Sequence, residues 1–531
     1  MMNKKLYAIL ALCLMGMVAK AEETLPQRAQ GAEPSESLTR LLEPGTSTVY
    51  YFNYPTVNAS GERIVLSSAL VAWTPDDRQQ SDSIETVHVY SHATIGADEE
   101  RPTSTGFSKE QIVLQTLPRR TYADAYDDTA ADYMGRCIII APDYEGFGLT
   151  KDLPHPYLSQ RLTARQVLDA VNYGLELYRK QTAEQSADNP LLPLKDDWRM
   201  FAIGYSQGGA VTLALQRLIE EEGLSDQLHF YGSICGDGPY DLVETLRYYF
   251  EDNGTSYGGT TDHRKGLCTY PVVVPLIIKG MCSTHPDMAK YRIEDYLSQQ
   301  LIDTDVLSWI DSKEYTTSEM AQMWYDQLQS GLMTLEHYYS PEQMAELFSS
   351  PREGKVSGHL DKMFTPATFA YLNNPDSMAV VPGKPATAQQ ALHRALADNS
   401  VATGWEPQHR IQFYHSRNDM VVPFGNYLVF RNAHPSLENS IYRIDDTFSD
   451  DDHMTAATLF FLQLTAVGSF APHFQWISEA AIAAGIDTAP LADAQHPTAE
   501  GNWYTLDGRR LSSKPTASGV YIHNQRKVVV K

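Results

Sequence analysis

The alternation of short apolar runs with helical stretches constrains this 531-residue chain more than any other feature of its sequence. Stretches with helical periodicity, such as Thr163–Tyr178 and Gly208–Glu221, separate several of the runs. Strands that alternate with helices build a mostly parallel sheet covered by helices on both faces. The sequence therefore predicts an α/β fold. The runs are Thr86–Tyr90, Cys137–Ala141, Met200–Ile203, Tyr231–Ile234, Ile411–Tyr414 and Ile441–Ile444.

The predicted core is interrupted and then followed by segments of different composition. Residues 45–240 and 396–484 carry the apolar runs, beginning with a hairpin around residues 58–61, whereas residues 241–395 show helical periodicity and predict a helical cap insertion. Residues 485–502, rich in Ala, Pro and Asp, predict a linker. Residues 503–531 hold six Lys and Arg residues against one Asp and predict a small β-rich tail.

The N-terminus has the three parts of a secretory signal peptide. Lys4 and Lys5 precede an apolar run, residues 6–18, that is too short to span a bilayer, and Ala19-Lys20-Ala21 forms a cleavage site. Residues 1–21 are therefore predicted to be a signal peptide, which predicts a periplasmic, cell-surface or extracellular protein with no transmembrane segment. A buried first helix and lipidation at Cys13 are the weaker alternatives.

Charge and cysteine content narrow the classes of partner. The chain has 42 basic and 66 acidic residues, a net charge of -24, which opposes binding to nucleic acid or to anionic lipid surfaces. Cleavage would leave four cysteines without a Cys-x-x-Cys pair, so no zinc site is predicted. Cys268 and Cys282 would meet an oxidising compartment, and a disulfide between them stays open. Cys137 and Cys235 are interpreted as packed thiols.

The stretch "FAIGYSQGGA" places a serine between two glycines at the end of an apolar run and the start of a helix. A Gly-x-Ser-x-Gly motif at a strand–turn–helix junction is typical of a nucleophile elbow. Gly204 and Gly208 would allow the tight turn, because a Cβ at either position would collide with neighbouring backbone. Ser206 is therefore the predicted nucleophile, with a tight turn around an inert serine as the alternative.

A serine nucleophile needs a base, and the base needs an orienting acid. Where such an elbow occurs, the chain order is serine, acid, histidine, and the site gathers at the carboxyl ends of the strands. Asp419 follows the run at 411–414 and His453 follows the run at 441–444, so these two complete the predicted triad. Asp445 and Asp446 are rival acids. Together with Asp450, Asp451 and Asp452, they form an acidic loop that is expected to raise the pKa of His453.

The predicted oxyanion hole combines the backbone N–H of Gln207 with one from the loop after the run at 86–90. Ala93 or Thr94 would supply this second donor. His92 is interpreted as a structural loop histidine, because it precedes the acid and is out of order for a base.

Several quoted segments together resemble a known family. "VYSHATIG", "IIIAPDYEGFG", "ARQVLDAVNYG", "GYSQGG", "HSRNDMVVPFGN" and "DDHM" follow the order and spacing of secretory lipases and related α/β-hydrolases, over residues 45–240 and 400–470. The resemblance implies an α/β-hydrolase fold and an esterase or lipase activity. It also implies that the helical insertion lies where the family carries its lid. Members commonly have His-Gly where this chain has His92-Ala93, so the loop donor stays open.

The tail carries a second resemblance. Its "GVYI" and lysine-ended valine run are similar to C-terminal sorting domains of the type IX secretion system, although the tail is shorter than most of these. A small hairpin docked on the enzyme is the alternative.

These observations predict a secreted serine hydrolase that cleaves small-molecule or lipid carboxylic esters through an acyl-enzyme, without a metal or cofactor. A prolyl-oligopeptidase-type peptidase would use the same triad, but only about 65 residues separate the cleavage site from the strand at Val87, too few for a propeller. A catalytically inactive surface binding protein would have a broken triad, and all three candidates are present. The oligomeric state is not predicted.

Overall fold

The computed structural model describes residues 32–42, 47–73, 83–106, 108–116, 137–184, 191–251, 264–435, 441–443 and 452–465, and four strands of the tail. The chain divides into two units, Met1–Ile477 and Ser478–Lys531. The predicted signal peptide, residues 1–21, and the predicted linker, residues 485–502, lie outside the described residues.

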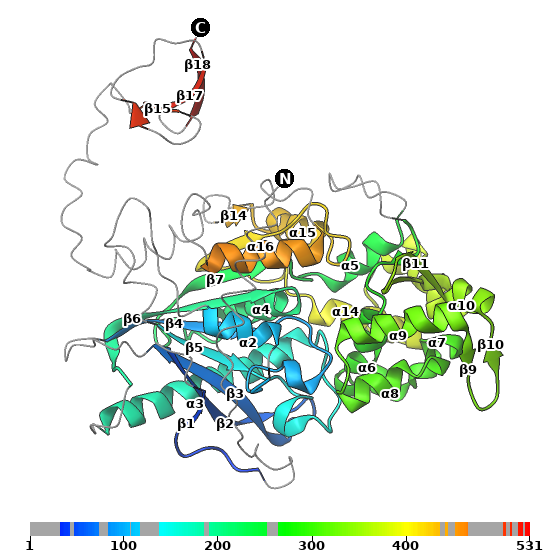
Figure 1. Ribbon diagram of the computed structural model, residues 1–531, viewed down its shortest axis with the longest axis horizontal. Helices are drawn as coiled ribbons and strands as arrows, with labels where there is room; N and C mark the ends of the chain where they lie inside the picture. The colour runs from blue at the N-terminus through cyan, green and yellow to red at the C-terminus, as the bar shows by residue number, and fades with distance from the viewer. Residues whose placement is uncertain are drawn as a thin grey trace. The chain divides into compact units, whose positions relative to one another are not determined.

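The first unit is built around a nine-stranded sheet (Figure 1). In space the strands follow the order β1-β2-β3-β5-β4-β6-β7-β13-β14. The pairs from β1 to β5 are antiparallel, and every pair from β5 to β14 is parallel, which confirms the mostly parallel sheet. The strands are β1 (Thr39–Leu42), β2 (Ser47–Val57), β3 (Arg63–Trp73), β4 (Ile84–Ser91), β5 (Cys137–Pro142), β6 (Leu194–Tyr205), β7 (Phe230–Gly236), β13 (Arg410–Tyr414) and β14 (Ile441–Arg443).

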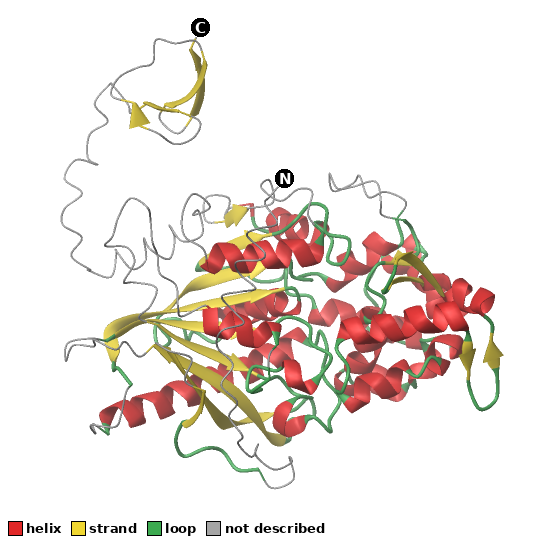
Figure 2. Ribbon diagram, viewed as in Figure 1, coloured by secondary structure: helices red, strands yellow, loops and turns green. Residues whose placement is uncertain are grey.

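Helices cover both faces of the sheet, because its central strands bury side chains on both sides (Figure 2). Ala202 of β6 joins one apolar cluster with α3 (Gln160–Ala183), α4 (Gln207–Glu221) and α15 (Gly425–Ala433). Tyr205, three residues later, points to the opposite face. There its ring centroid lies 5.3 Å from that of Phe460, on α16 (His453–Thr465). α2 (Lys109–Thr116) follows β4. The predicted fold class is confirmed.

The segment between β7 and β13, residues 242–399, is called the cap. It has an apolar core of its own, with Trp324 fully buried. The sequence predicted only helices here and missed five short strands, because strands of two to five residues leave no readable periodicity. The helices are α5 (Leu242–Tyr249), α6 (Val273–Thr284), α7 (Gln299–Asp303), α8 (Val306–Ser312), α9 (Thr317–Ser330), α10 (Pro341–Leu347), α11 (Leu360–Met363), α12 (Pro366–Leu372), α13 (Pro375–Met378) and α14 (Ala388–Asn399). The strands are β8 (Leu267–Cys268), β9 (Leu332–Met333), β10 (Tyr338–Tyr339), β11 (Phe348–Arg352) and β12 (Lys355–His359).

The disulfide that the sequence left open is not formed, since Cys268 and Cys282 are both free thiols. Most of the segment between them is helical. Cys282 lies near the end of α6, whose length places it roughly 14 Å from Val273 at the rise of a helix. Cys268 lies before that helix, in β8. Cys137 and Cys235 are buried, as expected of packed thiols.

The second unit contains a four-stranded antiparallel sheet of order β16-β15-β17-β18. Its strands are β15 (Trp503–Thr505), β16 (Arg510–Leu511), β17 (Gly519–His523) and β18 (Arg526–Val530). The two strands predicted from "GVYI" and the valine run are both present and pair with each other. Within the described ranges of the chain, no helix has the length and apolar character that a membrane span requires.

Candidate active site

Ser206 lies on a sharp turn between β6 and α4, with backbone angles of φ 57° and ψ -124°. A positive φ is strained for a residue with a side chain, and such strain is typical of a nucleophile held out of its sheet. The glycines on either side permit the turn. A Cβ at Gly208 would lie 2.0 Å from the Ser91 carbonyl oxygen, and one at Gly204 would lie 2.3 Å from the Gly208 oxygen. Only glycine fits at these two positions.

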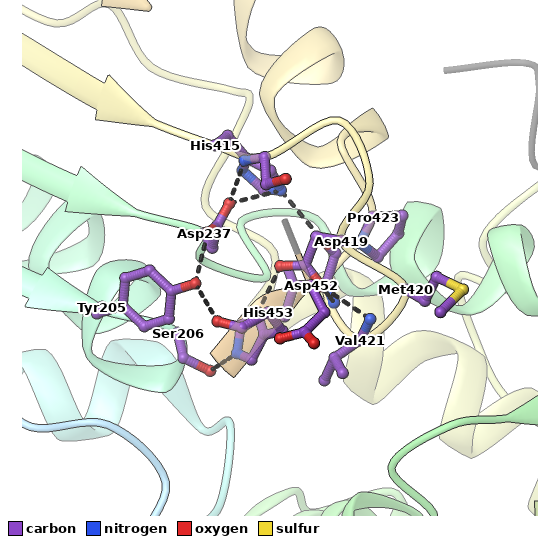
Figure 3. A network of polar contacts seen from close by, with 12 residues as sticks. Tyr205, Ser206, Asp237, His415, Asp419, Met420, Val421, Pro423, Asp452 and His453 are labelled. Carbon is purple, nitrogen blue, oxygen red and sulfur yellow. Dashed lines mark hydrogen bonds and ion pairs between the residues drawn. The ribbon is translucent and has the colours of Figure 1, made fainter. Parts of the chain in front are cut away.

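The structure brings the three predicted triad residues together (Figure 3). The Ser206 Oγ lies 2.9 Å from His453 Nε2, and His453 Nδ1 lies 2.5 Å from Asp419 Oδ2. The other oxygen of Asp419 accepts the backbone N–H groups of Val421 and Val422, both at 2.8 Å. Asp419 is therefore fixed by its own loop through Oδ1. Its Oδ2 holds the imidazole so that Nε2 faces the serine.

The pKa of His453 reflects opposing influences. Burial alone would lower this pKa, but the neighbouring carboxyl groups outweigh it, Asp419 foremost, then Asp237 where it is ionised, and then Asp452, so the pKa lies above its usual value. This is the direction that the acidic loop predicted. Asp452 also accepts the Thr455 N–H at 2.9 Å and so caps α16. The other acids of that loop, and with them the rival triad acids, lie outside the described residues: Asp445, Asp446, Asp450 and Asp451.

Gln207, the first residue of α4, follows the nucleophile, so its backbone N–H has no partner within the helix. Its side-chain amide donates to Nε2 of His155, 3.0 Å away, while His155 Nδ1 donates to the Glu145 carbonyl oxygen at 2.7 Å. Burial lowers the pKa of His155 to about 3, which keeps the ring neutral as this arrangement requires. Sequence reasoning missed His155, because the Gly-x-Ser-x-Gly motif does not indicate that Gln207 has a partner 52 residues away.

The loop after β4 carries the two candidate oxyanion donors, Ala93 and Thr94. Near it, the buried carboxyl of Glu110 lies 2.5 Å from the Tyr90 hydroxyl, and burial raises the pKa of Glu110 to about 7. The Thr94 hydroxyl lies 3.0 Å from the Tyr157 hydroxyl. The rings of His92 and Tyr144 stack with centroids 3.8 Å apart, which agrees with a structural role for this histidine. Both candidate donors, Ala93 and Thr94, line the cavity beside Ser206.

A second buried carboxyl group, Asp237, lies at the end of β7. Within the described residues, Asp237, His415 and Asp419 bring three metal-ligand atoms within 4.8 Å of one another. Asp419 already orients the base, and Asp237 accepts the Ser416 N–H at 2.7 Å. A cation bound here would compete with these hydrogen bonds. Sequence reasoning missed Asp237 because a single Asp in "ICGDGP" has the pattern of a turn.

A cavity of about 490 Å³ opens at Ser206. Ser206, Gln207 and His453 form part of its wall. Most of the remaining wall is apolar, with the cap contributing Leu242, Ile278, Leu360, Phe364, Leu392 and Leu396. A volume of this size is typical of a site for a small organic ligand.

Comparison with known proteins places the fold in a class. The chain has the α/β-hydrolase fold, and among solved structures it is similar to the rice cell wall degrading esterase LipA from Xanthomonas oryzae. That match has a TM-score of 0.54 and 18% identity over 80% of this chain and 90% of the esterase. It is also similar to a Legionella pneumophila protein that has been proposed to be a hydrolase, with a TM-score of 0.53 and 14% identity over 79% of this chain and 87% of that one. No family model matches the sequence, and no curated protein does.

The close approach at Gly208 generates a stability prediction. Gly208→Ala should lower the free energy of unfolding by at least about 2 kcal/mol, because the new methyl group collides with backbone that cannot move freely. Urea unfolding measures the change. Gly383→Ala is the control, since a Cβ there meets no atom within 4 Å, and it should change stability by less than about 0.5 kcal/mol. Equal stability of the two variants would contradict the close approach.

The raised pKa of His453 generates a pH prediction. Only the neutral imidazole accepts a proton from Ser206, so a raised pKa moves the acid limb of kcat/KM to higher pH. Asp452→Asn keeps the helix cap and removes a negative charge, so it should move that limb to lower pH by a few tenths of a unit at low ionic strength. The difference should vanish at high salt. Asp197→Asn, near the opposite end of β6, should leave the limb in place, and an equal shift in both variants would rule out a local effect.

Proposed function

We propose that this chain is a serine hydrolase of carboxylic esters. The observation that carries the proposal is the continuous set of contacts from Ser206 through His453 to Asp419, opening on an apolar cavity. An acyl-transfer enzyme requires these three groups in this order, and an apolar wall suits the acyl or alcohol part of an ester. An inactive binding protein has no need for an oriented imidazole on a strained serine.

In the proposed reaction, the Ser206 Oγ attacks the ester carbonyl carbon while Nε2 of His453 takes its proton. Asp419 holds the Nδ1 tautomer and stabilises the imidazolium that forms. The tetrahedral oxyanion accepts the backbone N–H of Gln207 and a second backbone N–H from Ala93 or Thr94. The positive N-terminal end of α4 adds to the stabilisation at Gln207. The imidazolium then protonates the leaving alkoxide. Water attacks the acyl-enzyme by the same route, so the cycle needs no metal or organic cofactor.

The substrate is proposed to be a neutral ester with an aliphatic part. Most of the lining side chains of the cap are aliphatic or aromatic, while the chain as a whole carries a net charge of -24. An anionic acid or phosphate would be repelled by that field and would lose its hydration in such a cavity. We further propose export by residues 1–21 and a sorting role for the tail, which rest on the sequence alone.

Ser206→Ala should abolish labelling by a fluorophosphonate probe and lower kcat by a factor on the order of 10⁴–10⁶, because the variant lacks the nucleophile. Gel fluorescence and a nitrophenyl ester assay measure the two losses. Ser233→Ala, which changes a buried serine of β7, is the matched control and should still label. Undiminished labelling of the Ser206 variant would place the nucleophile elsewhere.

The apolar cavity predicts a dependence on acyl length. Each methylene that it buries should raise kcat/KM by roughly threefold to fourfold, from about 0.8 kcal/mol per methylene, until the chain fills the available space. A series of nitrophenyl esters from acetate upward measures this slope. A flat series would contradict an acyl site in the cavity. Faster cleavage of proline-containing peptides than of any ester would instead favour the peptidase alternative.

A further inference from the structure

Asp237 belongs to a buried network that the proposed reaction does not use. It follows β7 and has a φ of 33°, a left-handed conformation that Asp and Asn tolerate better than most residues. Its backbone N–H donates to the Tyr414 carbonyl oxygen at 2.7 Å, which ties it to the neighbouring strand β13. The side chain is fully buried and turns toward the hydroxyl of Tyr205, the last residue of β6 (Figure 3).

The protons in this network can be counted. The Tyr205 hydroxyl lies 2.7 Å from the His453 carbonyl oxygen and 2.5 Å from Asp237 Oδ2. A carbonyl oxygen only accepts, and a tyrosine hydroxyl has a single proton to donate. If Tyr205 donates that proton to His453, the short contact with Asp237 requires a second proton, and the carboxyl group is the remaining source. With an ionised Asp237, one of the two contacts would join oxygens that have no proton between them.

The other neighbours of Asp237 do not balance a negative charge. Its Oδ1 accepts the Ser416 N–H, while His415 Nε2 is 3.6 Å from that oxygen and donates to the Val422 carbonyl oxygen at 3.0 Å. Burial lowers the pKa of His415 to about 4, so its ring is neutral. Burial and the charge of Asp419 raise the pKa of Asp237 well above its usual range. The titratable groups that face it are Tyr205, Tyr240, His415, Asp419 and His453.

We propose that Asp237 remains a neutral carboxylic acid in the working protein and, through Tyr205, positions the backbone of His453. The proton of Asp237 is donated to Tyr205, and the proton of Tyr205 is donated to the His453 carbonyl oxygen. Asp419 is then the ionised carboxyl group that is hydrogen-bonded to the imidazole, while Asp237 carries no charge. Asp237 and Tyr205 are positioning residues, because neither touches the reacting atoms. The positioning role rests on the proposed ester hydrolysis, whereas the protonation state does not.

Infrared difference spectroscopy tests the protonation state without turnover. The wild-type protein minus Asp237→Asn, at pH 7 to 8, should show the carbonyl stretch of a protonated carboxyl group. Titration of His453 by nuclear magnetic resonance provides a second measurement, and Asp237→Asn should leave its pKa in place because a neutral group replaces a neutral group. A missing band, or a His453 pKa that falls in the variant, would show an ionised Asp237 and overturn the proposal. Both readouts remain valid if the protein hydrolyses no ester.

Kinetics test the positioning role. Tyr205→Phe removes the hydroxyl that joins the two groups and should lower kcat by about 10–100-fold with little change in KM. Asp237→Leu should lower kcat similarly. Asp237→Asn should recover most of the activity, because its amide donates to Tyr205 as the acid does, with the acid limb of kcat/KM unmoved. If Asp237→Leu does not fold, Tyr205→Phe still tests the positioning role.

Two kinetic results would contradict the positioning role. One is a Tyr205→Phe variant with wild-type kcat. The other is an Asp237→Asn variant whose activity falls by as much as that of Asp419→Asn, about 10⁴-fold by analogy with other triads. If the wild-type protein does not react with fluorophosphonates or esters, the proposed function fails, and the infrared result alone then decides the state of Asp237.

Discussion

The parallel register of β6, β7 and β13 is the constraint on which the candidate site depends. Gly236 of β7 pairs with Tyr205 on one side and with Tyr414 on the other, so the three strands end together. Every group of the site follows one of these ends or contacts it. Ser206 continues β6, Asp237 continues β7, and the loop with Asp419 continues β13. A shift of one residue in this register would turn alternate side chains to the other face and separate these groups.

Placing carboxyl groups at this edge has an electrostatic cost. Two carboxylates within 4.8 Å of each other repel by at least roughly 3 kcal/mol at an effective dielectric constant of about 20. The surroundings of Asp419 and Asp237 reduce this repulsion in two different ways. Asp419 accepts two backbone N–H groups and the imidazole, which favours its charged form. Asp237 has one backbone donor and a tyrosine, and it avoids the repulsion if it stays neutral. Environment thus separates the roles of two chemically identical groups.

The sequence predicted the sheet, the elbow and the three triad candidates because each has a local signature. Ser206 lies between two glycines at a strand–helix junction, and Asp419 and His453 were selected by chain order together with their positions after two apolar runs. Asp237 and His155 have no such signature, because their roles depend on contacts with residues that are distant in the sequence. The cap strands were missed for a related reason. Two residues that pair with a distant strand, as Cys268 does with Gly358, leave no pattern along the chain.

The cap supplies much of the cavity wall, whereas the sheet positions the triad residues. Its cavity wall is assembled from single side chains of many short elements, such as Leu242 of α5, Phe364 after α11 and Leu396 of α14. Each of these elements is held by the core of the cap rather than by the sheet. The catalytic edge can therefore keep its geometry while residues in the cap change the depth and width of the cavity. In the proposed reaction, the sheet would place the groups that attack the ester bond, and the cap would select the molecule that brings that bond to Ser206.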